Sequence, residues 1–433
     1  MTALTRTQVF GYGMLGLPLA FAALPVYVYA PKFYAGLGLS LAAAGAILLA
    51  ARLADAFIDP WLGAWSDRVR HRKRFIALFL IPLGLGMAAL FNPPVQAGAW
   101  LSLWLCACLA VVYLGFSAAN IAYQAWGARI AHDAHQRTQV SASREGLGLV
   151  GVVLASLLPQ VLVPATNPGV APTVEAGLPL LSIWFLGILA VAAVVTLWLT
   201  PSGESPKNRS RSHSSAGLRA TLASPRMRRL LLVFALNGIA SSIPATLFLF
   251  FVADVLQAQA ASGRFLALYF VAAACALPLW VGASRRIGKR VAWLCAMAVA
   301  IAAFGWAFWL RPGDGTAFAL ICIASGAALG ADLALPPSML ADVIERDQAG
   351  GGEGSYFGVW NLVTKLNLAL AAGLALPALA WAGYQPGTGS AAVSAAGSTT
   401  AGSIAALAFA YCLVPCALKL CAAGLLFKSH FDR

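Results

Sequence analysis

Charged side chains are scarce in this chain of 433 residues: Asp, Glu, Lys and Arg together make up 10%, while 60% of the residues are hydrophobic. A soluble domain carries about 25% charged residues, so the composition excludes a water-soluble globule and a disordered chain. The apolar residues form long unbroken runs, such as LSLWLCACLAVVYLGF at 101–116. Transmembrane barrels show short alternating segments instead. The sequence therefore predicts an all-α protein that crosses a membrane many times.

Motifs for metal, redox and nucleotide chemistry are also missing. The five histidines (71, 132, 135, 213 and 430) fall in polar segments, and the eight cysteines lie in apolar runs without the spacing of a metal or haem site. No GxxxxGK[ST] loop occurs, which excludes an ATP-driven pump of that type. No nucleophile lies beside a base within the apolar segments. We expect no cofactor and no enzymatic activity.

Hydropathy at helix length predicts twelve transmembrane helices, because a span needs about 20 apolar residues. They lie at 9–30, 40–66, 75–92, 99–127, 140–164, 178–200, 227–253, 263–284, 291–310, 316–344, 354–384 and 402–427. Residues 201–226 are rich in Ser, Pro and Arg and are typical of a polar linker. We predict an N-terminal six-helix bundle at 1–200, a cytoplasmic linker at 201–226 and a C-terminal six-helix bundle at 227–433.

The net charge of +14 is distributed unevenly along the chain. With the N-terminus in the cytoplasm, most Lys and Arg fall in cytoplasmic segments, and three (Lys32, Arg264 and Arg311) lie outside. This pattern obeys the positive-inside rule. It indicates topology and attraction to anionic lipids, not nucleic-acid binding. Both termini are predicted to be cytoplasmic, residues 385–401 external, and the location the cell inner (plasma) membrane.

The two predicted halves resemble each other weakly. GAWSDRVRHRKRF (63–75) follows the second span and GASRRIGKR (282–290) the eighth, and both lead from small residues into a basic turn. A polar residue also enters the fourth span (Asn120) and the tenth (Asp332) at similar depth. Paired six-helix halves with a midplane site are typical of secondary transporters.

The second span carries three charges on one helical face: Arg52, Asp55 and Asp59. Charges inside a bilayer are costly and usually functional. Such a face can hold a small cation or exchange a proton; an Arg52–Asp55 ion pair kept for packing is the structural alternative. Asp59 precedes Pro60, and a proline inside a helix frees a backbone carbonyl that can serve as a further oxygen ligand.

Other polar residues inside spans are candidates for a binding site: Ser117, Asn120, Arg144, Asp332, Asn361 and Lys365. Lys365 lies near mid-span, four residues after Asn361, which favours a cavity position over one at the membrane surface. Arg144 fits an interfacial anchor equally well. Lys419, among apolar neighbours, is predicted to extend to the interface.

Gly63, Asp67 and Arg68 end the second span in the pattern GAWSDR. Glycine allows close helix approach. Asp67 can hold an opposing Arg or a helix N-terminus until the cytoplasmic side opens. We predict a cytoplasmic gate that includes these three residues, and the pattern resembles the signature loop of the major facilitator superfamily.

Longer stretches resemble one family of that superfamily: ARLADAFIDPWLGAWSDR, NIAYQAWGARIAHDAHQRTQVSASREG, LPPSMLADVIERD and EGSYFGVWNLVTK. They are similar to the glycoside-pentoside-hexuronide:cation symporters, the relatives of the melibiose carrier. The resemblance implies the major facilitator fold, a coupling-cation site at Asp55 and Asp59 completed by Asn120 with Ser117 beside it, and a substrate cavity that includes Arg144 and Lys365.

The chain departs from the family's sugar carriers at several positions. Leu19 stands where those carriers have an aspartate that grips sugar hydroxyls, and Gln124, beside Tyr123, replaces a stacking aromatic residue. Ile58 replaces an asparagine of the Na⁺-coupled members, and Asn120 an acid. Fewer hard oxygen ligands weaken Na⁺ relative to H⁺.

The sequence thus predicts a secondary transporter, functional as a monomer, that couples H⁺ or Na⁺ to a small organic solute by alternating access. The substrate-binding residues are predicted to be Arg52, Tyr123, Gln124, Arg144, Asp332, Asn361 and Lys365. Two cations near the cavity favour an organic anion or amphipathic solute, with a sugar or glycoside as the alternative. A non-transporting receptor or scaffold is the alternative from another functional class.

Overall fold

A computed structural model describes residues 4–94, 99–166, 177–202, 217–258, 261–347, 352–382 and 399–428. These residues form helices joined by turns, with no strand among them, and the all-α prediction is confirmed. Most of the predicted linker and most of the predicted external segment at 385–401 lie outside the described residues, as do His213 and His430.

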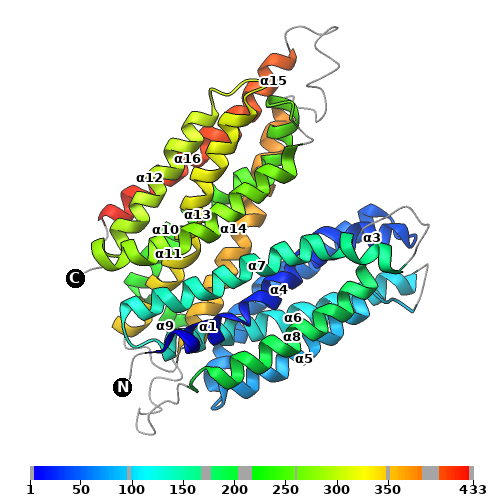
Figure 1. The fold of residues 1–433 in the computed structure, drawn as a ribbon, viewed down its shortest axis with the longest axis vertical. Helices are drawn as coiled ribbons and strands as arrows, with labels where there is room; N and C mark the ends of the chain where they lie inside the picture. Colours follow the sequence, from blue (N-terminus) through cyan, green and yellow to red (C-terminus); the bar gives the residue numbers. More distant parts are fainter. Residues whose placement is uncertain are drawn as a thin grey trace. The chain divides into compact units, whose positions relative to one another are not determined.

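The first group of helices begins with α1 and α2 and ends with α9 (Figure 1). Its members are α1 (Arg6–Gly13), α2 (Gly16–Leu24), a π-helical turn (Pro25–Tyr29), α3 (Ala30–Gly36), α4 (Leu41–Arg68), α5 (Arg72–Leu90), α6 (Ala99–Ile130), α7 (Ala134–Thr166), α8 (Leu178–Leu199) and α9 (Gly217–Ala223).

The second group follows in the same way. Its members are α10 (Pro225–Phe250), a π-helical turn (Phe251–Val255), α11 (Ser262–Ile287), α12 (Lys289–Ala307), α13 (Gly315–Arg346), α14 (Glu353–Trp381), α15 (Thr399–Ala408), a π-helical turn (Phe409–Leu413) and α16 (Val414–Lys428). Serine side chains cap α4 and α10: Ser40 Oγ accepts from the Ala43 amide at 3.2 Å, and Ser224 Oγ from the Met227 amide at 3.2 Å.

Eleven helical segments in the described residues are long and apolar enough to cross a membrane. They match eleven of the twelve predicted spans to within a few residues. The remaining predicted span is α4, which is 28 residues long and carries Arg52, Asp55 and Asp59 among its apolar residues. These three charges lie within eight residues of one another, on one face of the helix.

The chain divides into two compact units. Unit 1 contains residues 1–221 and 344–362, and unit 2 contains residues 222–343 and 363–433. The first ten residues of α14 therefore pack with the N-terminal helices, although they follow α13 in sequence. The predicted bundle limits of 1–200 and 227–433 stay a prediction.

Within unit 1, α5 packs against α6 and α8 (Figure 1). Helix α2 packs against α7. Glycines allow the close approach. A Cβ atom on Gly115 of α6 would lie 2.7 Å from the Leu83 backbone nitrogen of α5, and one on Gly151 of α7 would lie 2.1 Å from the Leu17 carbonyl oxygen. Small residues at helix contacts are typical of membrane proteins.

Within unit 2, α16 packs against α10 and α12. The core there is rich in aromatic rings: Phe251 stacks on Tyr411 with ring centroids 4.1 Å apart and lies 5.7 Å from the Phe318 ring. Phe251 and Tyr411 belong to the two π-helical turns of this unit. The aromatic contacts thus join α10, α13 and α16 around one apolar core.

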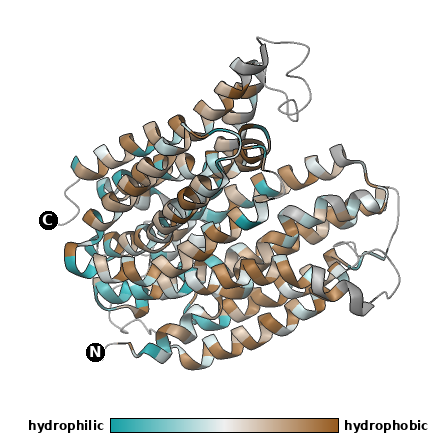
Figure 2. Cartoon of the chain, turned by 45° about the horizontal axis from the view of Figure 1, so that its top comes forward, coloured by the Kyte–Doolittle hydropathy of each residue, from teal (hydrophilic) through white to brown (hydrophobic). Residues whose placement is uncertain are grey.

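Large apolar side chains cover much of the surface of both units, and hydrophobic residues run along most helices (Figure 2). Trp381, Trp198 and Trp309 are 91%, 84% and 76% exposed and lie at helix ends. Tryptophan side chains at the ends of membrane-spanning helices anchor those helices at the membrane surface. The exposed apolar surface is the one expected of a multi-pass membrane protein.

Candidate functional site

The charged face of α4 is buried in unit 1. Asp55 and Asp59 are 5% and 0% exposed. The Ser117 hydroxyl of α6 donates a hydrogen bond to Asp55 Oδ1 at 2.6 Å. The Arg52 guanidinium lies over the Tyr27 ring, 4.4 Å from its centroid. The structure therefore brings together Asp55 and Ser117, two of the predicted cation-binding residues.

The side-chain amides of Asn120, Gln124 and Asn361 lie close together, about one helical turn beyond Ser117 along α6. The Gln124 amide donates to Asn361 Oδ1 at 3.3 Å, and the Asn120 amide lies 3.5 Å from the same oxygen. Asn361 itself donates to the Phe357 carbonyl at 2.9 Å, which orients its side chain. These predicted residues form a neutral polar cluster made by α6 and the part of α14 that belongs to unit 1.

Tyr123 lies in a tight contact between α1 and α6. Its ring stacks on Tyr12 with centroids 4.4 Å apart. The Tyr12 hydroxyl donates to the Tyr123 carbonyl at 3.0 Å, and the Tyr123 hydroxyl donates to the Tyr12 carbonyl. Both side chains are fully buried. Tyr12 and Tyr123 thus join α1 and α6 through two hydrogen bonds and one ring contact.

Arg144 of α7 pairs with the residue next to it. Its Nε donates to Glu145 Oε1 at 3.1 Å, and its Nη2 donates to the same oxygen. Neighbouring residues on a helix do not normally face each other, so both side chains bend to meet. Glu145 was not identified as a candidate site residue from the sequence, although it directly follows Arg144, which was.

Asp332 of α13 lies in unit 2, where its partner is Lys419 of α16. Lys419 Nζ lies 3.1 Å from Asp332 Oδ2 and also donates to Asn237 Oδ1 at 2.7 Å and Ser241 Oγ at 3.0 Å. Trp293 Nε1 donates to Asp332 Oδ1 at 2.7 Å. Lys419 is 2% exposed, so the prediction that it extends to the interface is wrong: three acceptors from α10 and α13 hold its ammonium inside the unit.

Lys365 lies on α14 one helical turn after Asn361, in the portion of the helix that clusters with unit 2. It therefore lies on the same face of α14 as Asn361, as the spacing predicts.

The predicted gate residue Asp67 accepts hydrogen bonds from the N-terminus of α14. Its carboxylate receives the backbone N–H groups of Gly354 at 2.6 Å and Ser355 at 2.8 Å, and the Ser355 hydroxyl at 2.8 Å. A helix N-terminus favours such an anion. Burial raises the pKa of the Asp67 carboxyl to about 6, and Arg72 opposes this rise.

Arginines extend this contact into a network. Arg72 Nη2 lies 3.0 Å from Asp67 Oδ1 and 2.7 Å from Glu353 Oε2, and Arg129 lies 3.0 Å from the same Glu353 oxygen. Arg68, which the sequence placed in the gate, is exposed and forms no ion pair with the described residues. The sequence analysis missed Arg72, Arg129 and Glu353, because their pairing joins segments more than 200 residues apart.

Gly63 brings α4 against the start of α14. A Cβ atom there would lie 2.2 Å from the Gly354 carbonyl oxygen. We expect Gly63→Ala to force these backbones apart and to lower the free energy of unfolding by about 1–3 kcal/mol, the usual cost of overpacking. The measurement is the midpoint of thermal unfolding in detergent. Gly45→Ala on the same helix, where the Cβ meets open space, is the control, and equal midpoints for the two variants would contradict the prediction.

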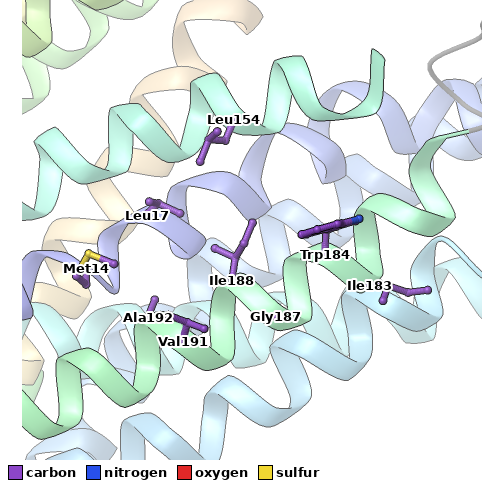
Figure 3. Close-up of a pocket in the computed structure, with 9 residues that line it drawn as sticks. All are labelled: Met14, Leu17, Leu154, Ile183, Trp184, Gly187, Ile188, Val191 and Ala192. Carbon is purple, nitrogen blue, oxygen red and sulfur yellow. The ribbon is translucent and has the colours of Figure 1, made fainter. Parts of the chain in front are cut away.

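An apolar hollow of about 550 Å³ lies between α2, α7 and α8 (Figure 3). Its walls include Leu17, Leu154, Trp184 and Ile188 and present almost no polar atom. A polar solute would lose its hydrogen bonds to water there without replacement. This hollow is therefore not a candidate for the solute site.

Comparison with known proteins identifies the family. The family model described as MFS/sugar transport protein matches residues 9–433. YagG of Escherichia coli (strain K12), assigned by name to glycoside/cation symport, is 26% identical over 174 residues, which are 39% of this chain and 38% of that protein. The inner membrane symporter YicJ of the same strain is 25% identical over 199 residues, 45% of this chain and 43% of that protein. These matches span about two fifths of each relative's length.

Solved structures show the fold. A bacterial homologue of the iron transporter ferroportin in its outward-facing state has a TM-score of 0.70 at 16% identity, covering 97% of this chain and 98% of that one. The transporter FucP has a TM-score of 0.66 at 15% identity, over 96% and 99%. The human organic anion transporter MFSD10 has a TM-score of 0.59 at 19% identity, over 97% and 98%. The major facilitator fold predicted from the sequence is confirmed.

The family consists of transporters and not of enzymes, in agreement with the sequence analysis. The matched region runs from the first helix to the last residue, so it includes the charged face of α4, the amide cluster and the Asp67 contact. The chain belongs to the MFS/sugar transport protein family.

Proposed function

We propose that the protein is a cation-coupled symporter that moves a small organic solute across the inner membrane by alternating access. The observation that carries the proposal is the pair of carboxylates, Asp55 and Asp59, buried on one face of a spanning helix with the Ser117 hydroxyl on Asp55. The names of YagG and YicJ, both symporters, support the same activity.

The chemistry of coupling follows from burial. A carboxylate inside a bilayer is costly while charged, so uptake of H⁺ or Na⁺ by Asp55 and Asp59 lowers the cost of the state that holds the ion. Carboxylate and hydroxyl oxygens are the ligands that hard cations prefer. Ile58 and Asn120 add no carboxylate oxygen to this face, which favours H⁺ over Na⁺.

The Asp67 contact supplies a reversible latch in this proposal. Hydrogen bonds from the α14 N-terminus and ion pairs with Arg72 hold the cytoplasmic end of α4. The side chains of Asp67 and Arg72 are only 8% and 4% exposed, and separating a buried ion pair is costly. We therefore propose that the latch opens only when water or another charged group replaces these partners.

Two classes of solute remain as candidates. Arg144 and Lys365 favour an organic anion or amphipathic solute, as the sequence predicts. A neutral glycoside is favoured by the Arg144–Glu145 ion pair, which neutralises one of those cations within unit 1, and by the name of YagG.

A pair of substitutions separates these candidates. For an anionic solute, we expect Lys365→Gln to weaken apparent affinity about 10- to 150-fold, the value of a charge-assisted hydrogen bond. Glu145→Gln should strengthen it, because Arg144 loses its internal partner. For a neutral glycoside, Lys365→Gln should change affinity less than twofold. Competition against a labelled solute in membrane vesicles measures the apparent affinity of each variant for each solute. An anion whose affinity is the same in both variants as in the unsubstituted protein is not the substrate.

The direct test of the proposed function is solute flux in proteoliposomes. Purified protein should accumulate its solute when a Na⁺ or a proton gradient is imposed, and dissipation of the effective gradient should stop it. A thermal-shift screen with and without Na⁺ and at two pH values supplies candidate solutes. Absence of flux for every solute that binds would support a receptor or scaffold.

The topology makes a further prediction. In a cysteine-free background, an impermeant thiol reagent added to intact cells should label Asp314→Cys, in the turn between α12 and α13, and not His71→Cys, between α4 and α5. Both positions are exposed. Permeabilised cells are the control, since both thiols should then react. Labelling of His71→Cys from outside would overturn the proposed orientation.

A further inference from the structure

A cavity of about 350 Å³ lies inside unit 2, apart from the charged face of α4. Helices α10, α11, α12, α13 and α16 all contribute to its wall. Because every lining residue belongs to unit 2, the cavity is complete within that unit. Its volume lies at the lower end of the range of small-molecule sites.

Six aromatic rings line the cavity among smaller apolar side chains, and several of these rings contact one another. Phe318 lies 6.2 Å from Phe248 by ring centroids, and Phe304 packs edge-on against Tyr411 at 5.9 Å. Tyr269 also lines the space. Neither tyrosine hydroxyl forms a hydrogen bond with another residue that the structure describes. The wall can therefore pack against the aromatic or alkyl part of a ligand, and the two tyrosine hydroxyls can form hydrogen bonds with it.

One end of the cavity is polar, because Asp332 and Lys419 line it. Lys419 is 2% exposed and has three hydrogen-bond acceptors for its three N–H donors. The Asp332 side chain is 14% exposed. Its Oδ1 accepts from Trp293 alone among the described residues, and a carboxylate oxygen has two acceptor positions. Asp332 is thus the member of the pair that can accept another hydrogen bond.

The charge balance determines which ligand fits. The ion pair with Lys419 neutralises Asp332, so a cationic ligand would leave one net positive charge in a mostly apolar site, and an anionic ligand would face the carboxylate. A neutral donor such as a hydroxyl avoids both costs. We propose that this unit 2 cavity binds a neutral amphipathic alcohol, with its aromatic or alkyl body among the rings and its hydroxyl donating to Asp332.

The test uses a photoreactive benzyl alcohol that carries a trifluoromethyl diazirine on its ring, applied to the detergent-purified full-length protein. Mass spectrometry should locate adducts on cavity-lining residues such as Tyr269 and Phe318. Excess benzyl alcohol should compete. The methyl ether of the probe, which cannot donate a hydrogen bond, should label about fivefold less, and the benzoate analogue should also label less. Equal labelling by the alcohol and the ether would overturn the proposal.

Matched variants locate the site. Ala300 is buried and lines the cavity, while Ala298 on the same helix is exposed. Ala300→Phe should fill the cavity and lower labelling at least fivefold, and Ala298→Phe should leave it unchanged. Ser325→Leu is a second filling variant, because among the described residues the Ser325 hydroxyl donates only to carbonyls of its own helix. Persistent adducts in a folded filling variant would exclude the cavity.

This binding is independent of the proposed transport activity. Labelling needs no ion gradient, and Asp59→Asn should leave it intact. A failed flux assay therefore does not affect the cavity proposal, and absent labelling does not affect the coupling proposal.

Discussion

Asp59→Asn is expected to abolish cation-driven accumulation and reduce the ratio of internal to external solute to one. Asp59 is fully buried on α4, and the amide keeps the shape of the side chain while removing the charge that an ion or proton requires. Asp55→Asn should have the same effect, because the hydrogen bond from Ser117 orients that carboxylate. Proteoliposomes with an imposed gradient measure the ratio.

Exchange of labelled for unlabelled solute at equal concentrations is the companion measurement. It does not require the ion to be released, so we expect it to continue in both variants and to show that the fold is intact. Asp314→Asn makes the same chemical change in an exposed turn and should accumulate normally. Full accumulation by Asp59→Asn and Asp55→Asn would end the coupling hypothesis.

Lys419→Met should have the largest effect on stability. It removes the ammonium partner of Asp332, whose side chain is only 14% exposed in unit 2. Breaking one side of a buried pair costs about 3–5 kcal/mol. We expect a large decrease in the unfolding midpoint in detergent, with the loss confined to unit 2 contacts such as the α10–α16 packing.

A double variant distinguishes the charge effect from lost packing. Lys419→Met with Asp332→Leu removes both charges and should recover most of the stability, since apolar replacements of buried pairs are often neutral. Lys289→Met is the matched control. Its pair with Asp342 is 10% and 19% exposed, so water compensates part of the loss and the midpoint should change less. A double variant as unstable as the single one would contradict the charge explanation.

The fold was largely predictable because membrane helices are determined by local composition. Eleven predicted spans coincide with apolar helices, and α4 was found because apolar residues on both sides of its charges keep the pattern of a span. The π-helical turns at Pro25–Tyr29, Phe251–Val255 and Phe409–Leu413 were not predicted. They depend on packing of aromatic residues such as Phe251 and Tyr411, which hydropathy does not report.

The candidate site was predictable only where one helix carries the pattern. Asp55 and Asp59 follow from their spacing on α4. The α14 partners of Asp67 and the partner of Lys419 do not, because Gly354 lies 287 residues from Asp67 and Asp332 lies 87 residues from Lys419. Lys419 was misplaced for this reason: its neighbours along the chain are apolar, and the acceptors that hold it come from α10 and α13.

The charged face of α4 also bears on how the protein is made. Each charge at the centre of a single helix costs about 3 kcal/mol during insertion, and each Leu, Ile or Phe returns only about 0.5 kcal/mol. Arg52, Asp55 and Asp59 together exceed what the apolar residues of α4 supply. The Ser117 hydroxyl that meets Asp55 is synthesised two helices later. We therefore expect α4 to insert poorly by itself and more efficiently when α6 is present.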